Sequence, residues 1–460
     1  MSLYIQKVQE ITNQFYAENG RLPSAFIQTF GCQMNDRESE KFSGILAAMG
    51  YSEGYSEEEA DLVLYNTCCV RKSAEDKIYG RLGALKSQKT KQPGKVLILC
   101  GCMPQRKEVM DNLNKHHRHI DIIFGTFNKH HLPKLLHENL TANKRVIEIL
   151  EAFSPDSPDA FEGQTSRFLS HKAGVTIIHG CNNFCAYCIV PYVRGRENSR
   201  DHKLILSEIK SLAADGVKEV MLLGQNVNSY SHSDIKFADL ISLTEEIAGI
   251  ERIRFMTSHP KDLSDDLIRV MAASQKVCKH IHLPMQSGST AVLEKMNRGY
   301  TKEGYINLIS KIYEAMPDIA ITTDIIVGFP GESEADFSDT LDVAKQAKFA
   351  GAFTFMYSPR EGTPAFNFKQ EYPKEVIKER FDRLVAQVNH MQAAFNKRYE
   401  NQSLSVMSDG ISGKGGRYTG RTDSNVLVHF DADASVLNGD ILNVHIDECR
   451  TFYLKGRIVI

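Results

Sequence analysis

Short apolar runs alternate with segments of helical periodicity over most of the chain, and this alternation is the strongest constraint on the fold. The pattern begins at Ala25. The first apolar runs are 26–30, 61–65, 96–99 and 120–124, with helices expected near 38–49, 73–89, 105–116 and 128–139. A repeat of strand and helix is typical of a mostly parallel sheet covered by helices. We therefore predict an N-terminal parallel α/β domain over residues 24–142.

A second and longer repeat of the same kind follows. Strands are expected at 175–179, 218–223, 252–257, 279–284, 319–327 and 351–357, with amphipathic helices at 204–214, 237–248, 267–274, 305–314 and 337–347. Six strand–helix units suit a partial (β/α)6 barrel, open on one side, whose active face lies at the carboxyl ends of its strands. We assign residues 169–398 to this barrel, including a long helix from about Lys374 to Tyr399.

Three further segments differ in composition from these repeats. Residues 1–23 are expected to form a mostly polar helical extension, to which we assign no function. Residues 143–168 include the Ser, Pro and Asp residues of 154–159 and are typical of an interdomain linker. Residues 399–460 contain short β runs separated by turn signals such as 437–440, which predicts a small antiparallel β-barrel.

Charge places limits on a nucleic-acid partner. The formal net charge is −2, so a surface that binds nucleic acid must be local. Residues 71–95 carry eight Lys or Arg against two acids, Glu75 and Asp76. A solvated helix face and a contact with an RNA backbone both account for this excess.

The sequence has neither of the patterns that direct a chain to or across a membrane. No apolar run approaches the roughly 18 residues that a membrane span needs, and the N-terminus lacks a basic stretch followed by an apolar one. We therefore expect a cytoplasmic protein without a membrane partner. Separately, we expect it to be a monomer. Ten cysteines in such a chain are expected to be reduced thiols or metal ligands rather than disulfides.

Three of these cysteines form a compact motif directly after the first strand of the second repeat. Cys181, Cys185 and Cys188 have C-x3-C-x2-C spacing, with no fourth cysteine or ligand-spaced histidine behind them. Three thiolates suit a cubane 4Fe-4S cluster with one iron open to a small molecule, which implies chemistry rather than electron transfer alone. Zinc is the main alternative, although zinc sites usually carry two paired C-x2-C motifs.

A second group of cysteines follows the strands of the first repeat. Cys32, Cys68 and Cys102 come after three successive strands. Ligands gather beyond the carboxyl ends of parallel strands, so we predict that these residues converge into another three-thiolate site. The alternative is that they are small buried hydrophobic residues. Cys100 is expected in the core, and spacing alone does not decide between Cys68 and Cys69.

Polar and glycine-rich loops follow all six strands of the predicted barrel. Turn chemistry explains any one of these loops, but six around one barrel edge predict a ligand pocket. Gln225, Ser258 and Gln286 are expected to form hydrogen bonds with a ligand in this pocket, and Gly328 is expected to let the backbone approach it.

Arg194 lies just beyond the cysteine triplet. Its guanidinium could hold a carboxylate or phosphate of a cofactor through two hydrogen bonds. An ion pair with Glu197 or another acid explains the residue equally well.

Several motifs resemble the radical S-adenosylmethionine (SAM) methylthiotransferase family, and the resemblance covers the chain from about residue 24 to the end. They are Gly31-Cys32-Gln33-Met34-Asn35, Asn66-Thr67-Cys68, Gly101-Cys102-Met103-Pro104-Gln105, Leu283-Pro284-Met285-Gln286-Ser287-Gly288-Ser289 and the aromatic Tyr187 before the last triplet cysteine. The family combines an α/β domain that holds an auxiliary cluster, a radical SAM barrel and a C-terminal TRAM barrel that binds RNA.

The resemblance implies a role for each cysteine group. It assigns Cys181, Cys185 and Cys188 to the radical SAM 4Fe-4S cluster. Cys32, Cys68 and Cys102 are assigned to the auxiliary 4Fe-4S cluster, which selects Cys68 over Cys69. Tyr187 is expected to contribute to the cofactor site. With SAM as the cofactor, Gln225, Ser258 and Gln286 are expected to bond its methionine or ribose groups, and Gly328 is expected to let the backbone approach its adenine or ribose.

The same resemblance implies the activity. The residues after Cys32 favour the branch that transfers a methylthio group to C2 of N(6)-dimethylallyladenosine at tRNA position 37, beside the anticodon. One SAM would yield the 5′-deoxyadenosyl radical that attacks C2, and a second would methylate sulfur on the auxiliary cluster. Sister branches act on threonylcarbamoyl adenosine in tRNA or on a ribosomal-protein aspartate. The partners implied are a tRNA anticodon stem-loop, an electron donor and a supplier of sulfur or clusters.

Overall fold

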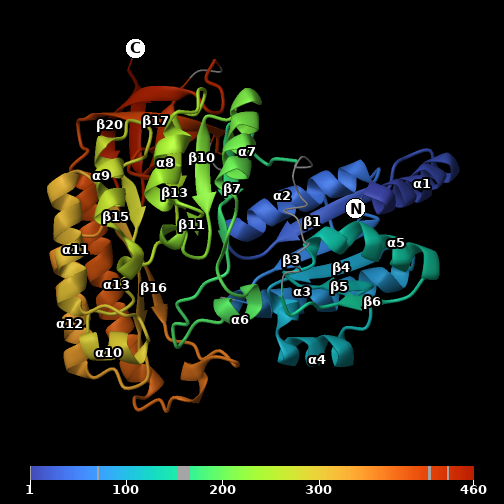
Figure 1. Cartoon of the computed structure of the whole chain (residues 1–460), viewed down its shortest axis with the longest axis horizontal. Helices are drawn as coiled ribbons and strands as arrows, with labels where there is room; N and C mark the ends of the chain where they lie inside the picture. The colour runs from blue at the N-terminus through green and yellow to red at the C-terminus, as the bar shows by residue number, and fades with distance from the viewer. Residues whose placement is uncertain (1, 70–71, 153–165, 413–415, 433–434, 460) are drawn as a thin grey trace. The chain divides into compact units, whose positions relative to one another are not determined.

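The computed structural model describes residues 2–69, 72–152, 166–412, 416–432 and 435–459, so the predicted turn-rich segment 154–159 lies outside the described residues. The chain forms two compact units, each described here by itself (Figure 1). The N-terminal unit comprises Met1–Phe168 together with Ile189–Arg196. The C-terminal unit comprises Leu169–Cys188 and Glu197–Ile460. The chain therefore leaves the C-terminal unit directly after the cysteine triplet and returns a few residues later.

The N-terminal unit is built on a six-stranded parallel sheet, which confirms the predicted α/β fold. The strand order is β2-β1-β3-β4-β5-β6. Their bounds are β1 Ser24–Thr29, β2 Ser52–Glu53, β3 Leu62–Thr67, β4 Val96–Gly101, β5 Ile122–Phe124 and β6 Val146–Glu148. Every residue of the central strands β3 and β4 is buried, as expected where helices cover both faces of a parallel sheet. Strand β6 lies within the range that we assigned to a linker, and its pairing with β5 makes it part of the sheet.

Helices cover both faces of this sheet. Their bounds are α1 Ser2–Asn19, α2 Gln33–Ala48, α3 Lys72–Lys91, α4 Lys107–His116, α5 Leu132–Ala142 and α6 Val190–Arg194, with short 3-10 turns η1 Met103–Gln105 and η2 Lys129–His131. Val8 of α1, Phe42 of α2 and Leu135 of α5 belong to the core on one face. Leu82 of α3 and Val193 of α6 belong to the core on the other. The N-terminal extension, to which we assigned no function, thus contributes to the core.

Six parallel strands and their helices form the predicted partial barrel of the C-terminal unit. The strands form two sheets, β7 Lys172–Thr176, β10 Glu219–Leu223 and β13 Arg252–Phe255 in one, and β14 His280–His282, β15 Ala320–Val327 and β16 Gly351–Met356 in the other. The helices are α7 His202–Ala214, α8 Phe237–Glu245, α9 Asp265–Ala273, α10 Thr290–Lys295, α11 Lys302–Ala315, α12 Glu334–Ala347 and α13 Lys374–Lys397. An isolated bridge from Ile253 to Val277 joins the segments at the boundary of the two sheets. The described barrel is thus interrupted between β13 and β14.

Short pairs of strands and 3-10 turns lie in the loops that connect the barrel strands and helices. Strand β8 (Ile178–His179) pairs with β9 (Asn198–Ser199), and β11 (Ser231–His232) pairs with β12 (Ile235–Lys236). The 3-10 turns are η3 Val227–Ser229, η4 Pro260–Asp262 and η5 Pro364–Asn367. The single strand predicted at 175–179 is therefore two strands, of which the second belongs to the loop region that carries the triplet.

The C-terminal residues form a small closed β-barrel, as predicted. Its strands are β17 Ser403–Ile411, β18 Tyr418–Thr422, β19 Leu427–Asp431, β20 Ile441–Cys449 and β21 Leu454–Ile458, in the order β17-β18-β19-β21-β20. All pairs are antiparallel except β19 with β21. Arg252 of β13 donates to the carbonyl oxygen of Arg421 at 2.8 Å, and Arg254 donates to that of Thr422 at 2.8 Å. These bonds fasten the small barrel to the partial barrel within one unit.

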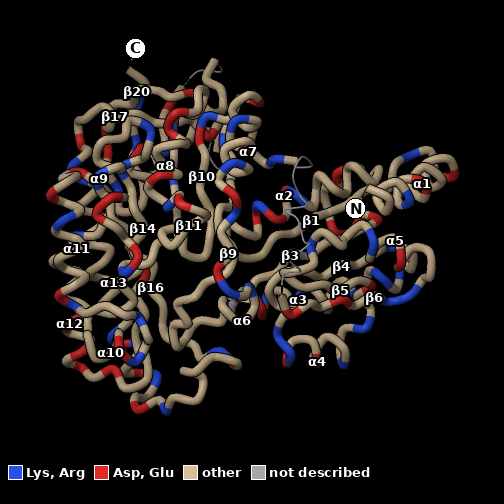
Figure 2. The backbone as a smooth tube through the Cα atoms, in the orientation of Figure 1, with Lys and Arg blue, Asp and Glu red and all other residues tan. Residues whose placement is uncertain are grey.

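Charges of both signs are spread over the two units (Figure 2). Several basic side chains of the stretch 71–95 take part in contacts within the protein. Arg81 pairs with Glu57, and Lys89 lies 2.8 Å from a carboxylate oxygen of Asp121. The buried Lys95 donates to the carbonyl oxygen of residue 58 at 2.9 Å. These three basic side chains therefore stabilise the fold through contacts within the protein. No helix within the described residues is long and apolar enough to cross a membrane.

Candidate active site

The loop that carries the cysteine triplet turns sharply after β8. Gly180 and Phe184 have φ of 73° and 44°, a left-handed backbone that is unusual for phenylalanine. Cys181 and Cys185 are buried and Cys188 is half-buried. The loop thus places three sulfur atoms at the end of the first barrel strand, where the sequence predicts them.

Neighbouring loops hold this conformation. The Gly180 N–H donates to the side-chain oxygen of Gln225, at the end of β10. Asn297, after α10, donates to the carbonyl oxygens of Asn183 at 3.2 Å and Phe184 at 3.0 Å. Gln225, which we predicted to contact a cofactor, is therefore engaged in supporting the cysteine loop.

A buried arginine lies against the triplet. Arg298 Nη1 is 3.2 Å from Cys185 Sγ, while its Nη2 donates to the Pro284 carbonyl at 3.2 Å and its Nε to the Tyr300 hydroxyl at 3.1 Å. Arg298 therefore places a positive charge beside one cysteine of the triplet. Burial raises the pKa of the Cys181 thiol to about 11, so a bound metal would be needed to keep that sulfur ionised at neutral pH. Nothing in the spacing around Arg298 marked it in the sequence.

Buried polar atoms without hydrogen-bond partners gather at the carboxyl ends of the barrel strands. Among the described residues they include Asn226 Oδ1, Ser258 Oγ, His259 Nε2, Gln286 Oε1 and Glu332 Oε1. Folded proteins leave few such atoms unpaired, so a group of them at one barrel end is typical of a site that receives a ligand. Ser258 and Gln286 are two of the residues that we predicted for this role. Gln286 also has φ of 64°, a strained conformation of the kind found at functional sites.

The loop after β15 requires glycine at position 328, because the backbone is left-handed there and because there is no room for a side chain. The φ of Gly328 is 74°, and an added Cβ would lie 2.5 Å from Cγ2 of Ile377 on α13. Its N–H donates to the carboxylate of Glu332 at 2.7 Å. The need for glycine here therefore has a packing cause, and the approach of a cofactor to Gly328 stays a prediction. Burial raises the pKa of Glu332 to about 7.

The pKa of Glu332 predicts a pH dependence of stability. Because the folded-state pKa is about 7 and the ordinary value is 4.5, the folded state holds the proton more tightly. Stability is then fully present below pH 4.5 and is lost as pH rises through 7. Glu332→Gln should remove this loss, which amounts to at most about 3 kcal/mol. Free energies of unfolding measured for both proteins between about pH 5 and pH 8 check this. Curves that stay parallel would contradict it.

The strand ends of the N-terminal unit bring the other three cysteines together. Cys32 precedes α2, while Cys68 and Cys102 follow the adjacent strands β3 and β4. A Cβ added to Gly31 would lie 3.1 Å from Cys68 Sγ, and the Cys102 N–H donates to the Thr67 carbonyl at 2.9 Å. The three loops therefore meet at one sheet edge, as predicted.

Cys69 shares this region. It is fully buried in the apolar cluster that contains Ile78 and Leu82. A hydrogen bond from Cys69 and the nearby charge of Arg194 lower the pKa of the Cys102 thiol. Cys69 is thus a neighbour of the site, and the choice of Cys68 as ligand rests on the resemblance of its motif.

Arg194 lies in the N-terminal unit, beside these cysteines. Its Nε is 3.2 Å from Cys102 Sγ, its Nη1 is 2.9 Å from Glu38 Oε1 and its Nη2 is 2.9 Å from Asn35 Oδ1. Lys129 also pairs with Glu38. Burial alone would raise the pKa of Glu38, but the charges of Arg194 and Lys129 lower it to about 2.

These contacts correct one prediction. We expected Arg194 either to hold a cofactor carboxylate or phosphate, or to form an ion pair. The structure shows the ion pair, with Glu38 rather than Glu197. The residue therefore belongs to the Cys32, Cys68 and Cys102 group and not to the barrel pocket.

The two cysteine groups share one arrangement of donors. Each has three cysteines and one buried arginine at 3.2 Å from a sulfur atom. Three thiolates suit a cubane cluster with one open iron, whereas structural zinc sites usually have four protein ligands.

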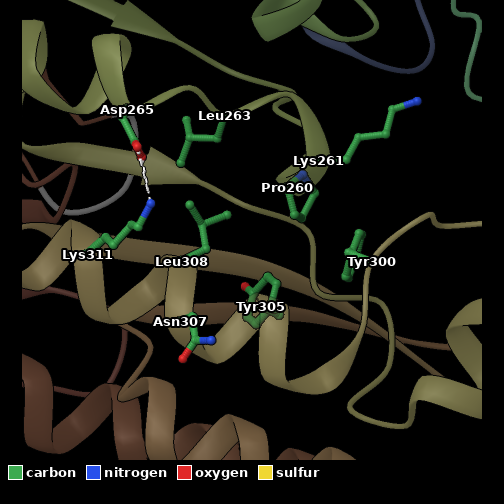
Figure 3. Close-up of a pocket in the computed structure, with 10 residues that line it drawn as sticks. Pro260, Lys261, Leu263, Asp265, Tyr300, Tyr305, Asn307, Leu308 and Lys311 are labelled. Atoms are coloured by element: carbon green, nitrogen blue, oxygen red, sulfur yellow. Dashed lines mark hydrogen bonds and ion pairs between the residues drawn. The ribbon is translucent and has the colours of Figure 1, made fainter.

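A surface pocket adjoins the residues that support the triplet (Figure 3). It is lined by Pro260, Lys261, Leu263, Asp265, Tyr300, Gly304, Tyr305, Asn307, Leu308 and Lys311. Lys311 and Asp265 pair at 3.0 Å, and the Tyr300 hydroxyl is bonded to the Met285 carbonyl at 2.9 Å. These groups already satisfy one another, so we assign no ligand to this pocket. Tyr300 joins its wall to Arg298.

Comparison with known families finds a match within each of the three predicted domains. The radical SAM superfamily matches residues 175–344, a family described as "Uncharacterized protein family UPF0004" matches residues 24–125, and the TRAM domain matches residues 397–459. A solved radical S-adenosylmethionine methyltransferase, TsrM from Kitasatospora setae, shares the fold with a TM-score of 0.53 and 13% identity, over 75% of this chain and 74% of that one. The fold and the cysteine triplet define a radical SAM enzyme, a class whose cofactors are a 4Fe-4S cluster and SAM.

Full-length relatives narrow this class. The chain is 49% identical to the tRNA-2-methylthio-N(6)-dimethylallyladenosine synthase of Acetivibrio thermocellus, over 99% of this chain and 95% of that one, and 47% identical to the enzyme of the same name from Lachnoclostridium phytofermentans over the whole length of both. The chain belongs to the family of tRNA-2-methylthio-N(6)-dimethylallyladenosine synthases. The predicted family resemblance is confirmed.

Proposed function

We propose that this enzyme transfers a methylthio group to C2 of N(6)-dimethylallyladenosine at tRNA position 37, beside the anticodon, using two SAM molecules and two 4Fe-4S clusters. The observation that carries the proposal is the presence of two three-cysteine sites, each with its own buried arginine, in a chain of this family. A single site would suffice for radical formation alone. The second site supports a further task, which in this proposal is the handling of sulfur.

We assign the metal ligands by site. The radical SAM cluster is held by Cys181, Cys185 and Cys188, and the auxiliary cluster by Cys32, Cys68 and Cys102. When bound, the clusters and SAM supply the electron, the radical and the sulfur of the reaction. Arg298 and Arg194 each place a positive charge beside one cysteine of their site, which offsets the negative charge that thiolates accumulate.

The unpaired polar atoms of the barrel are proposed to bind SAM. Ser258 Oγ and Gln286 Oε1 would bond its methionine or ribose groups, and His259 would do so as a neutral ring, because burial lowers its pKa to about 2. Gly328 would let the backbone approach the adenine. Tyr187, half-buried and 6.4 Å from the ring of Phe329, would form an aromatic wall next to the triplet.

Binding of tRNA requires that the target base leave its neighbours. Unstacking a base costs a few kcal/mol, which stacking and hydrogen bonds in a pocket offset. We propose that the small barrel β17–β21 contributes to RNA binding, since small barrels of this kind present a face to single-stranded RNA. An electron donor and a supplier of sulfur or clusters complete the set of partners.

Anaerobic reconstitution tests the proposal. The protein is loaded with iron and sulfide, both are quantified, and it is incubated with reductant, SAM and an anticodon stem-loop that contains dimethylallyladenosine. We expect about eight irons per chain and a gain of one methylthio group on that nucleoside by mass spectrometry. SAM cleavage without this gain would mean that the substrate is another one, either threonylcarbamoyl adenosine in tRNA or a protein aspartate. Zinc in place of iron would overturn it.

A further inference from the structure

A group of metal-ligating side chains lies outside both cysteine sites, in the C-terminal unit. Asp201 precedes α7, His202 is its first residue, and His232 ends β11. Each residue offers one ligand atom, and these atoms all lie within 4.8 Å of one another. In the part of the chain that the structure describes, this is the one group of at least three such residues so arranged.

The two imidazole rings direct nitrogen atoms at the carboxylate without bonding to it. His202 Nδ1 is 3.6 Å and His232 Nδ1 is 3.9 Å from Asp201 Oδ1, both longer than a hydrogen bond. Both Nδ1 atoms are buried and have no hydrogen-bond partner. An unsatisfied buried polar atom costs about 1–3 kcal/mol, so two that face the same oxygen need an explanation.

We propose that Asp201, His202 and His232 bind a divalent transition metal ion of the zinc type. Zinc takes imidazole nitrogen at about 2.0–2.1 Å and carboxylate oxygen at about 2.0–2.2 Å, which places neighbouring ligand atoms roughly 3.3 Å apart. The observed separations of 3.6 and 3.9 Å therefore need only a small contraction. Two imidazoles and one carboxylate suit zinc, copper, nickel or ferrous iron rather than magnesium or calcium, and water would complete the coordination.

The surroundings indicate a structural role for the ion. The Tyr230 hydroxyl donates to the Arg200 carbonyl at 2.9 Å, and the Ser231 N–H donates to Ser199 Oγ at 3.1 Å. These bonds already attach the β11–β12 hairpin to the segment that leads into α7. A metal ion on His232 would strengthen the same attachment, where the chain re-enters the C-terminal unit at Glu197. This inference does not depend on the proposed substrate.

Cobalt binding to the cluster-loaded enzyme tests this inference. Loading both clusters first occupies the cysteine sites, and a chelation step then removes loosely bound metal. Titration with Co²⁺ is expected to give one ion per chain with visible d–d bands and without thiolate-to-cobalt charge transfer, since the ligands carry nitrogen and oxygen. Zinc should displace the ion and raise the melting temperature.

Variants separate a built site from incidental binding. Asp201→Asn keeps an N-cap residue for α7, because asparagine caps as well as aspartate, but removes a charged ligand. His232→Ala removes a second ligand. Each should weaken Co²⁺ binding at least about tenfold, whereas the exposed His390→Ala on α13 should not. Absence of Co²⁺ binding, a sulfur charge-transfer band, or unchanged affinity in both ligand variants would overturn the proposal.

Discussion

Replacing Cys102 by alanine is expected to abolish methylthio transfer while SAM is still cleaved to 5′-deoxyadenosine. Cys102 lies in the N-terminal unit, where its sulfur contacts Arg194. The triplet at Cys181 lies in the C-terminal unit with its own arginine. Methylthio product should fall at least about a hundredfold, because even loss of a group that supports a metal ligand costs 10–100-fold. Chromatography of nucleosides and of 5′-deoxyadenosine from one incubation measures both activities.

Two neighbouring cysteines, Cys100 and Cys69, supply matched control variants. Cys100 is fully buried on β4, two residues before Cys102. Cys100→Ala therefore controls for the loss of a buried thiol in this sheet. Cys32→Ala and Cys68→Ala should reproduce the loss of transfer, and Cys69→Ala should retain it. If Cys69→Ala loses transfer while Cys68→Ala keeps it, the ligand assignment moves to Cys69. Loss of SAM cleavage in all three ligand variants, with the triplet's cluster intact, would contradict the division of labour.

Arg194→Met is expected to destabilise the N-terminal unit and lower its iron content. The substitution leaves the buried Glu38 with Lys129 and without the guanidinium that now lies 2.9 Å away. Breaking a buried ion pair by removal of one partner costs about 3–5 kcal/mol, and Lys129 should hold the loss near the lower value. Denaturant unfolding and iron analysis of the reconstituted protein measure the two effects.

A double-variant cycle identifies the cause. Glu38→Gln removes the buried charge that Arg194→Met leaves behind, so the double variant should lose less stability than the sum of the two single variants. Arg118→Met replaces an exposed arginine of the same unit and should leave stability within about 0.5 kcal/mol. Additive losses in the double variant would show that the pair with Glu38 is not the cause.

The positions of the cysteines followed from the sequence because they depend on local spacing and on parallel topology. The triplet needs only the loop after one strand, and Cys32, Cys68 and Cys102 each follow a strand whose neighbours the alternation predicts. The short strand β6 escaped prediction because its three residues become a strand only through pairing with β5.

The arginines that contact the cysteines could not be placed in the same way. Arg298 follows α10 and contacts Cys185, more than a hundred residues earlier in the chain. Arg194 belongs to the N-terminal unit, although the strand before it, β8, belongs to the C-terminal unit. Their partners are set by packing between segments far apart in the chain, for which periodicity carries no signal. Gln225 was found as a polar loop residue, but its bond to the Gly180 N–H required the folded loop. The same holds for Asp201, His202 and His232, whose spacing resembles no metal motif.

The short excursion of the chain at Ile189–Arg196 constrains the order of events during synthesis on the ribosome. The core of the N-terminal unit includes Ile189 and Val193, and Thr126 Oγ1 donates to the Val193 carbonyl at 2.6 Å. Domains commonly fold from the N-terminus as they emerge. This unit cannot complete its core until residue 196 has left the exit tunnel. By then all six proposed cluster ligands have been synthesised, so the N-terminal unit can complete its core and receive its cluster before the C-terminal unit, which includes Arg298, has been made.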